Sequence, residues 1–486
     1  MARTHPRIAC KHCAIPLLGM LLCLMLASPV AAPSLSFTVN TSEPVVVTGT
    51  PRLAIYVGGV TRYATYASGT GSSALTFSYA VQAGDFDANG ITIATPLDLN
   101  GGTLTDLAGN PSTALNFTVP NTSALKVQTY TTSFTTSPIT NANASAVNFS
   151  ITKAPTGASF SYTITSSGGS GSVTGSGTIG GLSHTVSGVD VSSLASGTLT
   201  LSVTVSTAAG GAGAAKTATA TPTFTGVLDG WSAGAATYST RRMRSAYAGP
   251  LMRVRRSSDN TEQDIASTLA GLLDTTTLST FCGSGSCFVR TWYDQSGTGR
   301  DALQTNSAVQ PRIVNAGVID SINGAPAPFF NGVNSILKTS TFLPTSNLVW
   351  SSHLIHIIGN GPPLGGRVWG MSSNPSMAAT LTTDDYRGAD NVALSTSGST
   401  SPRIVSAGIA ATTSTDIWVN GILGATRVSF SGQVGGDTLI VGNLGAIQRG
   451  LHGYIHTLYF GQGAYSTANR QAVERWMGTI SGITVP

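Results

Sequence analysis

The chain has little charge. Asp, Glu, Lys and Arg make up 9% of its 486 residues, whereas they make up about a quarter of an ordinary soluble protein. Such a sequence cannot rely on helices with charged outer faces. Its 57 glycines and the many Ser and Thr residues of its first half are instead typical of strands with hydroxyl-bearing outer faces joined by glycine turns. The formal net charge of +5 includes basic residues at the extreme N-terminus and does not indicate a nucleic-acid partner.

Long hydrophobic runs are also missing. The longest run, residues 14–27, is shorter than the roughly 20 residues that cross a bilayer. Basic residues precede it, and Ser-Pro-Val-Ala-Ala follows at 28–32. This order predicts a secretory signal peptide over residues 1–32, with a transmembrane anchor as the alternative. We therefore expect a secreted or cell-surface protein with no membrane span in the mature chain.

Cysteine is scarce, and three of the five cysteines lie within the predicted signal peptide. The remaining two, Cys282 and Cys287, occur as Cys-Gly-Ser-Gly-Ser-Cys. In an exported protein this spacing predicts a disulfide that closes a small loop. A metal site would require more ligands, and no histidine lies nearby. We therefore assign no metal and no cofactor.

Residues 33–122 form the first predicted domain. Leu75, Phe77 and Tyr79 alternate with small residues, which predicts a strand with one apolar face. Three turn-rich stretches resemble the bacterial Ig-like modules of large secreted and adhesive proteins; these are residues 49–51, 81–90 and 99–110.

One of those stretches also has the spacing of a calcium-binding loop. Asp85, Asp87 and Asn89 follow one another at alternate positions before a glycine. The glutamate that closes such a loop is absent. Calcium therefore stays an alternative to an ordinary turn.

Residues 123–226 form the second predicted domain, which is Ig-like by pattern. Alternating large apolar residues such as Leu201, Val203 and Val205 predict one face of a sandwich. The glycine-rich stretches 168–181 and 210–213 predict hairpin loops.

Residues 227–486 form the third predicted domain, in which Arg, Trp and Asp become common. Two short helices are predicted, one capped by Asp274 and the other capped by Ser466 and ended by Gly478. The rest is rich in strand patterns, including a hairpin signal at Asn420–Gly421. A single large β-sandwich fits this pattern. The predicted fold class is thus all-β, with two Ig-like sandwiches followed by a larger one.

Several motifs in the third domain resemble the catalytic domain of α-L-arabinofuranosidase B, glycoside hydrolase family 54. The sharpest similarities lie at residues 236–250, 255–259, 281–287, 293–301 and 322–327. The tail resembles the closing strand and helix of concanavalin-A-like and laminin-G-like jelly rolls. The resemblance implies a jelly-roll fold and a retaining cleavage of terminal arabinofuranosyl groups, with a glutamate nucleophile and an aspartate acid/base.

Retaining glycosidases need two carboxyl groups about 5 to 5.5 Å apart. Beyond the predicted signal peptide the only glutamates are Glu43, Glu262 and Glu474, and none falls in the middle of the third domain. The resemblance places Asp385, with its neighbour Asp384, near the nucleophile position. Because adjacent strand residues point to opposite faces, at most one of the two faces a cleft.

The acid/base position carries an amide. The family's Gly-Asp before the last strands corresponds here to Gly442-Asn443. An amide cannot donate the proton that the leaving oxygen requires, a contribution of about 10² to 10⁴ in rate. Unless Asp437 or another aspartate replaces it, catalysis is expected to be impaired.

Other candidate ligand contacts are less specific. Asp294, in Tyr-Asp-Gln-Ser-Gly, is either a contact to the ligand or, as we favour, the organiser of its own turn. Trp369 is either a core residue or a stacking platform for a sugar ring, whereas Trp292 and Trp418 are predicted to be core residues.

Six arginines lie between residues 241 and 256. They predict either a strand edge blunted by charge, which we favour, or a contact to acidic polysaccharide. Three functional hypotheses follow for the chain: a glycan-binding protein with impaired catalysis, an active arabinofuranosidase that acts on arabinose-containing polysaccharide, and an adhesin or structural surface protein. The expected partner is a polysaccharide or cell-surface glycan.

Overall fold

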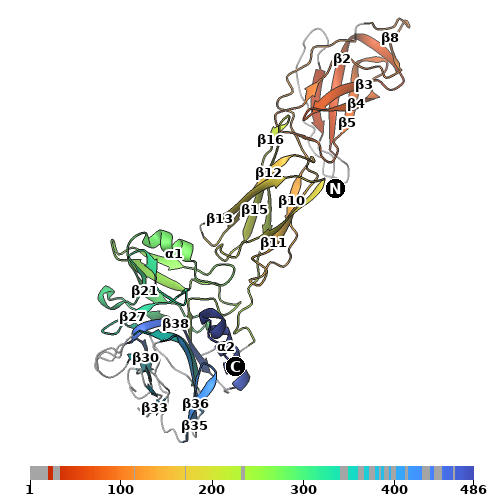
Figure 1. The fold of residues 1–486 in the computed structure, drawn as a ribbon. Helices are drawn as coiled ribbons and strands as arrows, with labels where there is room; N and C mark the ends of the chain where they lie inside the picture. Colours follow the sequence, from red (N-terminus) through yellow and green to blue (C-terminus); the bar gives the residue numbers. More distant parts are fainter. Residues whose placement is uncertain are drawn as a thin grey trace, which may run out of the picture.

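A computed structural model of the chain describes only part of its 486 residues. The described residues are 20–25, 33–113, 115–169, 171–230, 236–339, 349–358, 366–371, 378–381, 385–387, 393–395, 401–410, 414–428, 438–442, 451–462 and 466–486. Within them, regular structure is almost entirely β, in several sandwich sheets, as the sequence predicts. Figure 1 shows three successive β assemblies, with the C-terminal assembly at the far end from β2.

The first assembly is built around one large sheet with the order β1-β2-β5-β4-β3-β7. The predicted alternation in β5 is confirmed, because Leu75, Phe77 and Tyr79 are all buried. β2 pairs with β5 through its first half and with β8 through its last residues, with a register shift between Asn40 and Val45. The strands are β1 (Met20–Met25), β2 (Ser34–Thr48), β3 (Arg52–Val57), β4 (Val60–Ser68), β5 (Ser72–Ala80), β7 (Thr92–Ile93) and β8 (Thr103–Asp106).

The second assembly consists of two sheets that enclose one apolar core. The predicted apolar face of β15 is confirmed, because its large side chains are buried. The two sheets contact each other through the rings of Phe149 and Tyr162, whose centres lie 5.0 Å apart in an edge-to-face arrangement. One sheet contains β10 (Thr131–Phe134), β11 (Val147–Thr152) and β14 (Ser183–Val189). The other contains β12 (Ser159–Ser166), β13 (Ser172–Thr178), β15 (Leu199–Thr207), β16 (Gly211–Ala212) and β17 (Lys216–Ala220).

One prediction for this assembly is wrong. Part of the glycine-rich stretch 168–181 is not a loop but strand β13, which pairs with β12 over seven residues. Side chains at Gly175 and Gly177 would collide with aromatic rings, since an added Cβ would lie 2.5 Å from the Tyr162 hydroxyl and 2.8 Å from the Phe160 ring. Glycine is present here because the rings of the neighbouring strand cover the backbone.

In the C-terminal assembly the strand pairing closes on itself from β18 to β38. Its centre is an apolar cluster in which Trp292, predicted as a core residue, is fully buried. Trp418 is also largely buried, and the hairpin predicted at Asn420–Gly421 joins β35 to β36. The early strands are β18 (Ala236–Ser239), β19 (Met252–Arg256), β20 (Glu262–Ile265), β21 (Cys287–Trp292), β22 (Ala302–Leu303), β23 (Arg312–Asn315), β24 (Val318–Ile319), β27 (Phe329–Asn331) and β28 (Leu337–Lys338), with the separate hairpin β25 (Ser321–Ile322) and β26 (Ala325–Pro326). The later strands are β29 (Val349–Ile357), β30 (Gly366–Met371), β31 (Ala378–Leu381), β32 (Asp385–Arg387), β33 (Ala393–Ser395), β34 (Arg403–Ala410), β35 (Ser414–Val419), β36 (Ile422–Val428), β37 (Leu439–Val441) and β38 (His452–Gln462).

Both predicted helices are present, with the predicted N-caps. In α1 (Thr275–Cys282) the Asp274 carboxylate accepts from the Thr277 N–H at 2.9 Å. In α2 (Thr467–Ser481) Ser466 has the same role, but the helix ends at Gly482 and not at Gly478. Gly478 lies inside the helix because the C-terminal tail folds back over it, so that an added Cβ would lie 2.5 Å from the Ile483 carbonyl oxygen. In the part of the chain that the structure describes, neither helix has the length and apolarity needed to cross a membrane.

Backbone hydrogen bonds join the assemblies. Between the first and second, the Ala88 N–H donates to the Gly210 carbonyl at 2.7 Å, and β6 (Phe86–Asp87) pairs with β9 (Val127–Gln128). Between the second and third, the Leu269 N–H donates to the Leu194 carbonyl at 2.7 Å. The domain boundaries proposed from the sequence, near residues 122 and 226, remain predictions.

The candidate calcium loop lies at the first of these junctions. Asp85 accepts hydrogen bonds from the Arg62 guanidinium and from the Tyr79 hydroxyl, the latter at 2.5 Å. Asp87 accepts from the backbone N–H groups of Gly58 and Gly90, at 2.7 and 2.9 Å. Because protein donors occupy both carboxylates, this geometry favours the ordinary turn over a calcium site.

Candidate functional site

The structure describes the predicted catalytic positions only in part. Asp384, Asp437 and Asn443 lie outside the described residues. Asp385 is the first residue of β32, and its backbone is placed opposite Ser395 of β33. The predicted pairing of an aspartate with an amide across a cleft therefore remains a prediction.

The backbone around these positions nevertheless lies in neighbouring strands. Trp369 in β30 pairs with Ala379 of β31 on one side and with Val441 of β37 on the other. β31 in turn pairs with β32, which begins at Asp385. Trp369 and Asp385 thus belong to strands two steps apart, about 10 Å across a sheet. The strand that leads toward Asn443 runs beside the strand of Trp369.

Gly442 immediately precedes the predicted acid/base position and lies in a tight environment. Its φ is +100°, and an added Cβ would lie 2.4 Å from the Phe330 ring. Its N–H donates to the Val368 carbonyl at 3.0 Å, and its carbonyl accepts from Leu451 at 2.9 Å. Packing and hydrogen bonding therefore fix the backbone at Gly442.

Asp294 is buried and accepts several hydrogen bonds. One oxygen accepts from the N–H groups of Thr237 and Ser296, at 2.8 and 2.9 Å. The other accepts from the hydroxyls of Ser296 and Thr298, both at 2.7 Å, and from the Arg300 N–H at 3.2 Å. These contacts support the interpretation in which Asp294 organises its own turn and ties it to β18.

A second carboxyl of the same motif escaped the sequence analysis. Burial, reinforced by the neighbouring Asp294 charge, raises the pKa of Asp301 above its ordinary value. Hydrogen bonds from Arg253, at 2.8 and 2.7 Å, hold the pKa of Asp264 below its ordinary value. Asp301 is the last residue of the 293–301 motif, and its place in that motif was the only sign in the sequence that it differs from other aspartates.

The predicted disulfide is confirmed. Cys282, the last residue of α1, is bonded to Cys287, the first residue of β21. The bond thus joins the short helix to a central strand of the assembly. The two sulfur atoms are not available as metal ligands.

The three arginines of β19 do not lie on a free strand edge, because β19 pairs with both β20 and β21. Arg255 donates to the side chains of Gln310 and Asn260, each at 2.8 Å. Arg256 forms an ion pair with Asp259 at 2.6 Å. Most of these arginines therefore serve the packing of the assembly itself.

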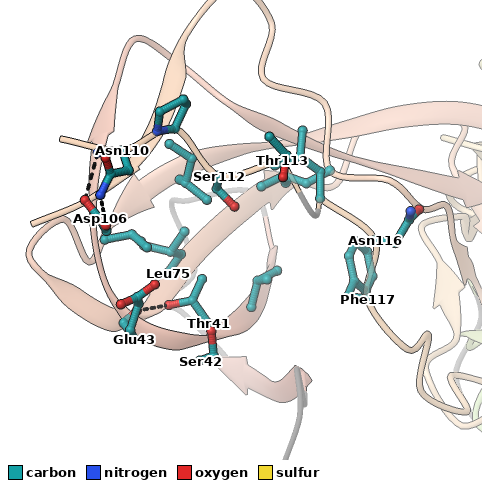
Figure 2. A pocket seen from close by; sticks show the side chains of 16 residues that line it. Thr41, Ser42, Glu43, Leu75, Asp106, Asn110, Ser112, Thr113, Asn116 and Phe117 are labelled. Atoms are coloured by element: carbon teal, nitrogen blue, oxygen red, sulfur yellow. Dashed lines mark hydrogen bonds between the residues drawn. The ribbon is translucent and has the colours of Figure 1, made fainter. Parts of the chain in front are cut away.

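The first assembly contains a pocket of about 530 Å³. As Figure 2 shows, Thr41 and Glu43 lie on one side of it and Asp106 and Asn110 on another. The Asn110 side chain donates to Asp106 at 2.7 Å, so this carboxylate already has a partner. Among the described residues that line it, the charged ones are both acidic and many of the others are apolar. The pocket does not suit an anionic ligand.

Comparisons with known proteins point to the C-terminal assembly. Residues 229–328 match the family model for the catalytic domain of α-L-arabinofuranosidase B. The probable α-L-arabinofuranosidase B of Aspergillus clavatus is 42% identical over 71 residues, which are 14% of this chain and 14% of that protein. The α-L-arabinofuranosidase of Hypocrea jecorina is 37% identical over 70 residues, again 14% of each chain. The match thus spans about one seventh of the length of these curated relatives.

Among solved structures, an arabinofuranosidase complexed with arabinofuranosyl-α-1,2-xylobiose aligns with 52% of this chain and 64% of its own, at a TM-score of 0.41 and 17% identity. The binding domain of botulinum neurotoxin serotype D aligns with 47% of this chain and 51% of its own, at a TM-score of 0.29 and 8% identity. Likenesses this weak carry no functional assignment.

Proposed function

We propose that the protein is an exported, glycan-directed surface or secreted protein whose C-terminal assembly binds arabinose-containing polysaccharide and hydrolyses it poorly or not at all. The observation that carries this proposal is the match of residues 229–328 to the arabinofuranosidase B catalytic domain. The first two assemblies would act as a stalk, and the predicted signal peptide would export the chain.

The expected loss of activity rests on the chemistry of two carboxyl groups. A retaining glycosidase uses one as the nucleophile and the other first as acid and then as base. Asp385 can supply the first function, although its side chain is shorter than that of glutamate. Asn443 can position a leaving oxygen but cannot protonate it. Trp369 would offer an aromatic face to the sugar ring.

Hydrolysis of 4-nitrophenyl α-L-arabinofuranoside and binding to arabinan, measured in parallel, test the proposal. We expect arabinan binding with little or no hydrolysis in the unaltered protein. Asn443→Asp should raise the rate by about 10²-fold or more if only the proton donor is missing. Asn443→Ser, which restores no carboxyl group, is the matched control.

Two results would contradict this assignment. Efficient hydrolysis by the unaltered protein, abolished by Asp385→Asn, would establish an active arabinofuranosidase instead. The absence of both hydrolysis and arabinan binding would leave the adhesin or structural hypothesis as the better one.

A further inference from the structure

A second pocket, of about 520 Å³, lies in the C-terminal assembly. It is bounded by the end of β18, the start of α1, the β25–β26 hairpin and strand β38, and neither Trp369 nor Asp385 lines it. Its polar lining consists of Thr240, Arg241, Thr275, Ser321, Asn323 and His456. No Asp or Glu is among the described residues that line it.

Arg241 differs from the other arginines of its segment. Arg242, Arg244, Arg253, Arg255 and Arg256 each donate a side-chain hydrogen bond to a protein acceptor. Within the described part of the chain, the Arg241 guanidinium has neither a hydrogen bond nor an ion pair, although it is half-buried. Burial lowers the pKa of Arg241, but a guanidinium remains charged at any physiological pH. The pocket wall therefore carries an uncompensated positive charge.

His456 supplies a second unsatisfied group. The residue is fully buried, and its Nε2 has no hydrogen-bond partner among the described residues. Burial, together with the Arg241 charge, lowers the pKa of His456 to about 3, so that the ring is neutral near pH 7. A neutral imidazole carries one proton, and neighbouring hydroxyls decide which nitrogen holds it.

The hydrogen-bond inventory around the ring assigns that proton to Nε2. Ser239 Oγ accepts a hydrogen bond from the backbone N–H of Arg241 at 3.1 Å and lies 2.9 Å from Thr457 Oγ1. Thr457 Oγ1 also lies 2.7 Å from His456 Nδ1. Both hydroxyl protons find acceptors only if Ser239 donates to Thr457 and Thr457 donates to Nδ1. His456 Nδ1 is then an acceptor, and Nε2–H is a donor without a partner.

From these contacts we propose that the pocket binds the carboxylate of a uronic acid residue. The Arg241 fork would hold the two carboxylate oxygens, and the neutral His456 ring adds no charge of its own to the pocket wall. One guanidinium and one neutral imidazole match the single charge of a carboxylate better than the double charge of a phosphate monoester. The volume accommodates a sugar, with Ser321 available to its hydroxyls and Leu272 and Pro326 to its C–H face.

This inference goes beyond the arabinose site and does not depend on it, because the two sets of residues do not overlap. Isothermal titration calorimetry with methyl α-D-galactopyranosiduronate, against methyl α-D-galactopyranoside as the neutral match, tests it in the full-length protein. We expect the uronoside to bind at least tenfold more tightly, and Arg241→Met to weaken it about 10- to 100-fold. Arg241→Lys should recover only part of the loss, because it keeps the charge but not the fork.

Arg290→Met is the matched control, since Arg290 lies outside the pocket and contacts Glu262 at 3.4 Å. It should leave uronoside binding unchanged, and both variants should keep the thermal midpoint of the unaltered protein. Arabinan binding should survive Arg241→Met, which separates a failure here from a failure of the arabinose site. Tighter binding of a trigalacturonate than of the monosaccharide would identify polysaccharide as the source.

Three results would overturn the assignment. One is that the neutral galactoside binds as tightly as the uronoside. Another is that Arg241→Met binds the uronoside with unchanged affinity. Inorganic sulfate could also compete as strongly as the uronoside, which would make the pocket a general anion site.

Discussion

The second and the C-terminal assemblies bury different kinds of side chain. Between residues 129 and 226 the only buried polar side chains among the described residues are Ser150 and Ser166. The C-terminal assembly buries many that are charged or titratable; these are Arg244, Arg255, Asp274, Asp294, Asp320, His353, Arg403, His456, Arg470 and Glu474. A buried charge is tolerated only when it is paired and hydrogen-bonded. The stability of the C-terminal assembly therefore depends on specific ion pairs and hydrogen bonds, whereas that of the second assembly depends on apolar packing.

The largest effect is expected at the ion pair inside α2. Glu474 is fully buried and accepts a hydrogen bond from Arg470, whose guanidinium also lies 4.3 Å from the Trp418 ring centre. Glu474→Gln leaves a buried cation without its counter-charge and should lower the free energy of unfolding by about 3 to 5 kcal/mol. Urea denaturation followed by tryptophan fluorescence measures the loss. The double variant Arg470→Met with Glu474→Leu should recover most of it, and a loss as large in the double variant would argue against the pair.

The next effect is expected at Asp294. Asp294→Asn keeps the shape of the side chain but replaces an acceptor oxygen by an NH₂ group that faces hydroxyl and N–H donors. We expect a loss of about 2 kcal/mol in the free energy of unfolding, measured by the same denaturation. Asp259→Asn, at an exposed position of the same assembly, is the control and should lower the free energy of unfolding much less, because its ion pair with Arg256 is exposed to solvent. Equal effects at the two positions would show that burial does not set the difference between the regions.

In the second assembly, the sensitive positions should be glycines. Gly175→Ala places a methyl group against the Tyr162 ring and should cost about 1 to 2 kcal/mol. Gly181→Ala adds the same methyl group where no atom lies within 4 Å, so its midpoint in urea should stay close to that of the unaltered protein. If both variants behave alike, the close approach of ring and backbone is not what keeps glycine in β13.

The smallest effect concerns pH. The pKa of Asp301 is raised in the folded protein, so the fold favours the protonated form. Its contribution to stability is therefore lost as the pH rises from the ordinary value of 3.8 through the higher folded value. Asp301→Asn cannot ionise and should gain less than about 1 kcal/mol relative to the unaltered protein at pH 7, and nothing at pH 3. A relative gain at pH 3 as large as at pH 7 would contradict the raised pKa.

Local sequence signals predicted much of this molecule. Alternating apolar residues located β5 and β15, Asp274 and Ser466 marked the helix starts, and the spacing of Cys282 and Cys287 indicated their disulfide. Each of these features depends on residues close together in the chain, where strand period, capping chemistry and loop closure act directly.

Tertiary contacts decided the rest. Position 175 within the strand is occupied by glycine because the Tyr162 ring covers it. Position 478 within the helix is occupied by glycine because the C-terminal tail packs over it. Asp301 has a raised pKa because packing buries it. The pocket of Arg241 and His456 is formed by segments more than 200 residues apart in sequence, and no local pattern encodes which charges folding leaves without a partner. The sequence by itself determined the β architecture and the local caps, whereas long-range packing determined where unpaired polar groups meet.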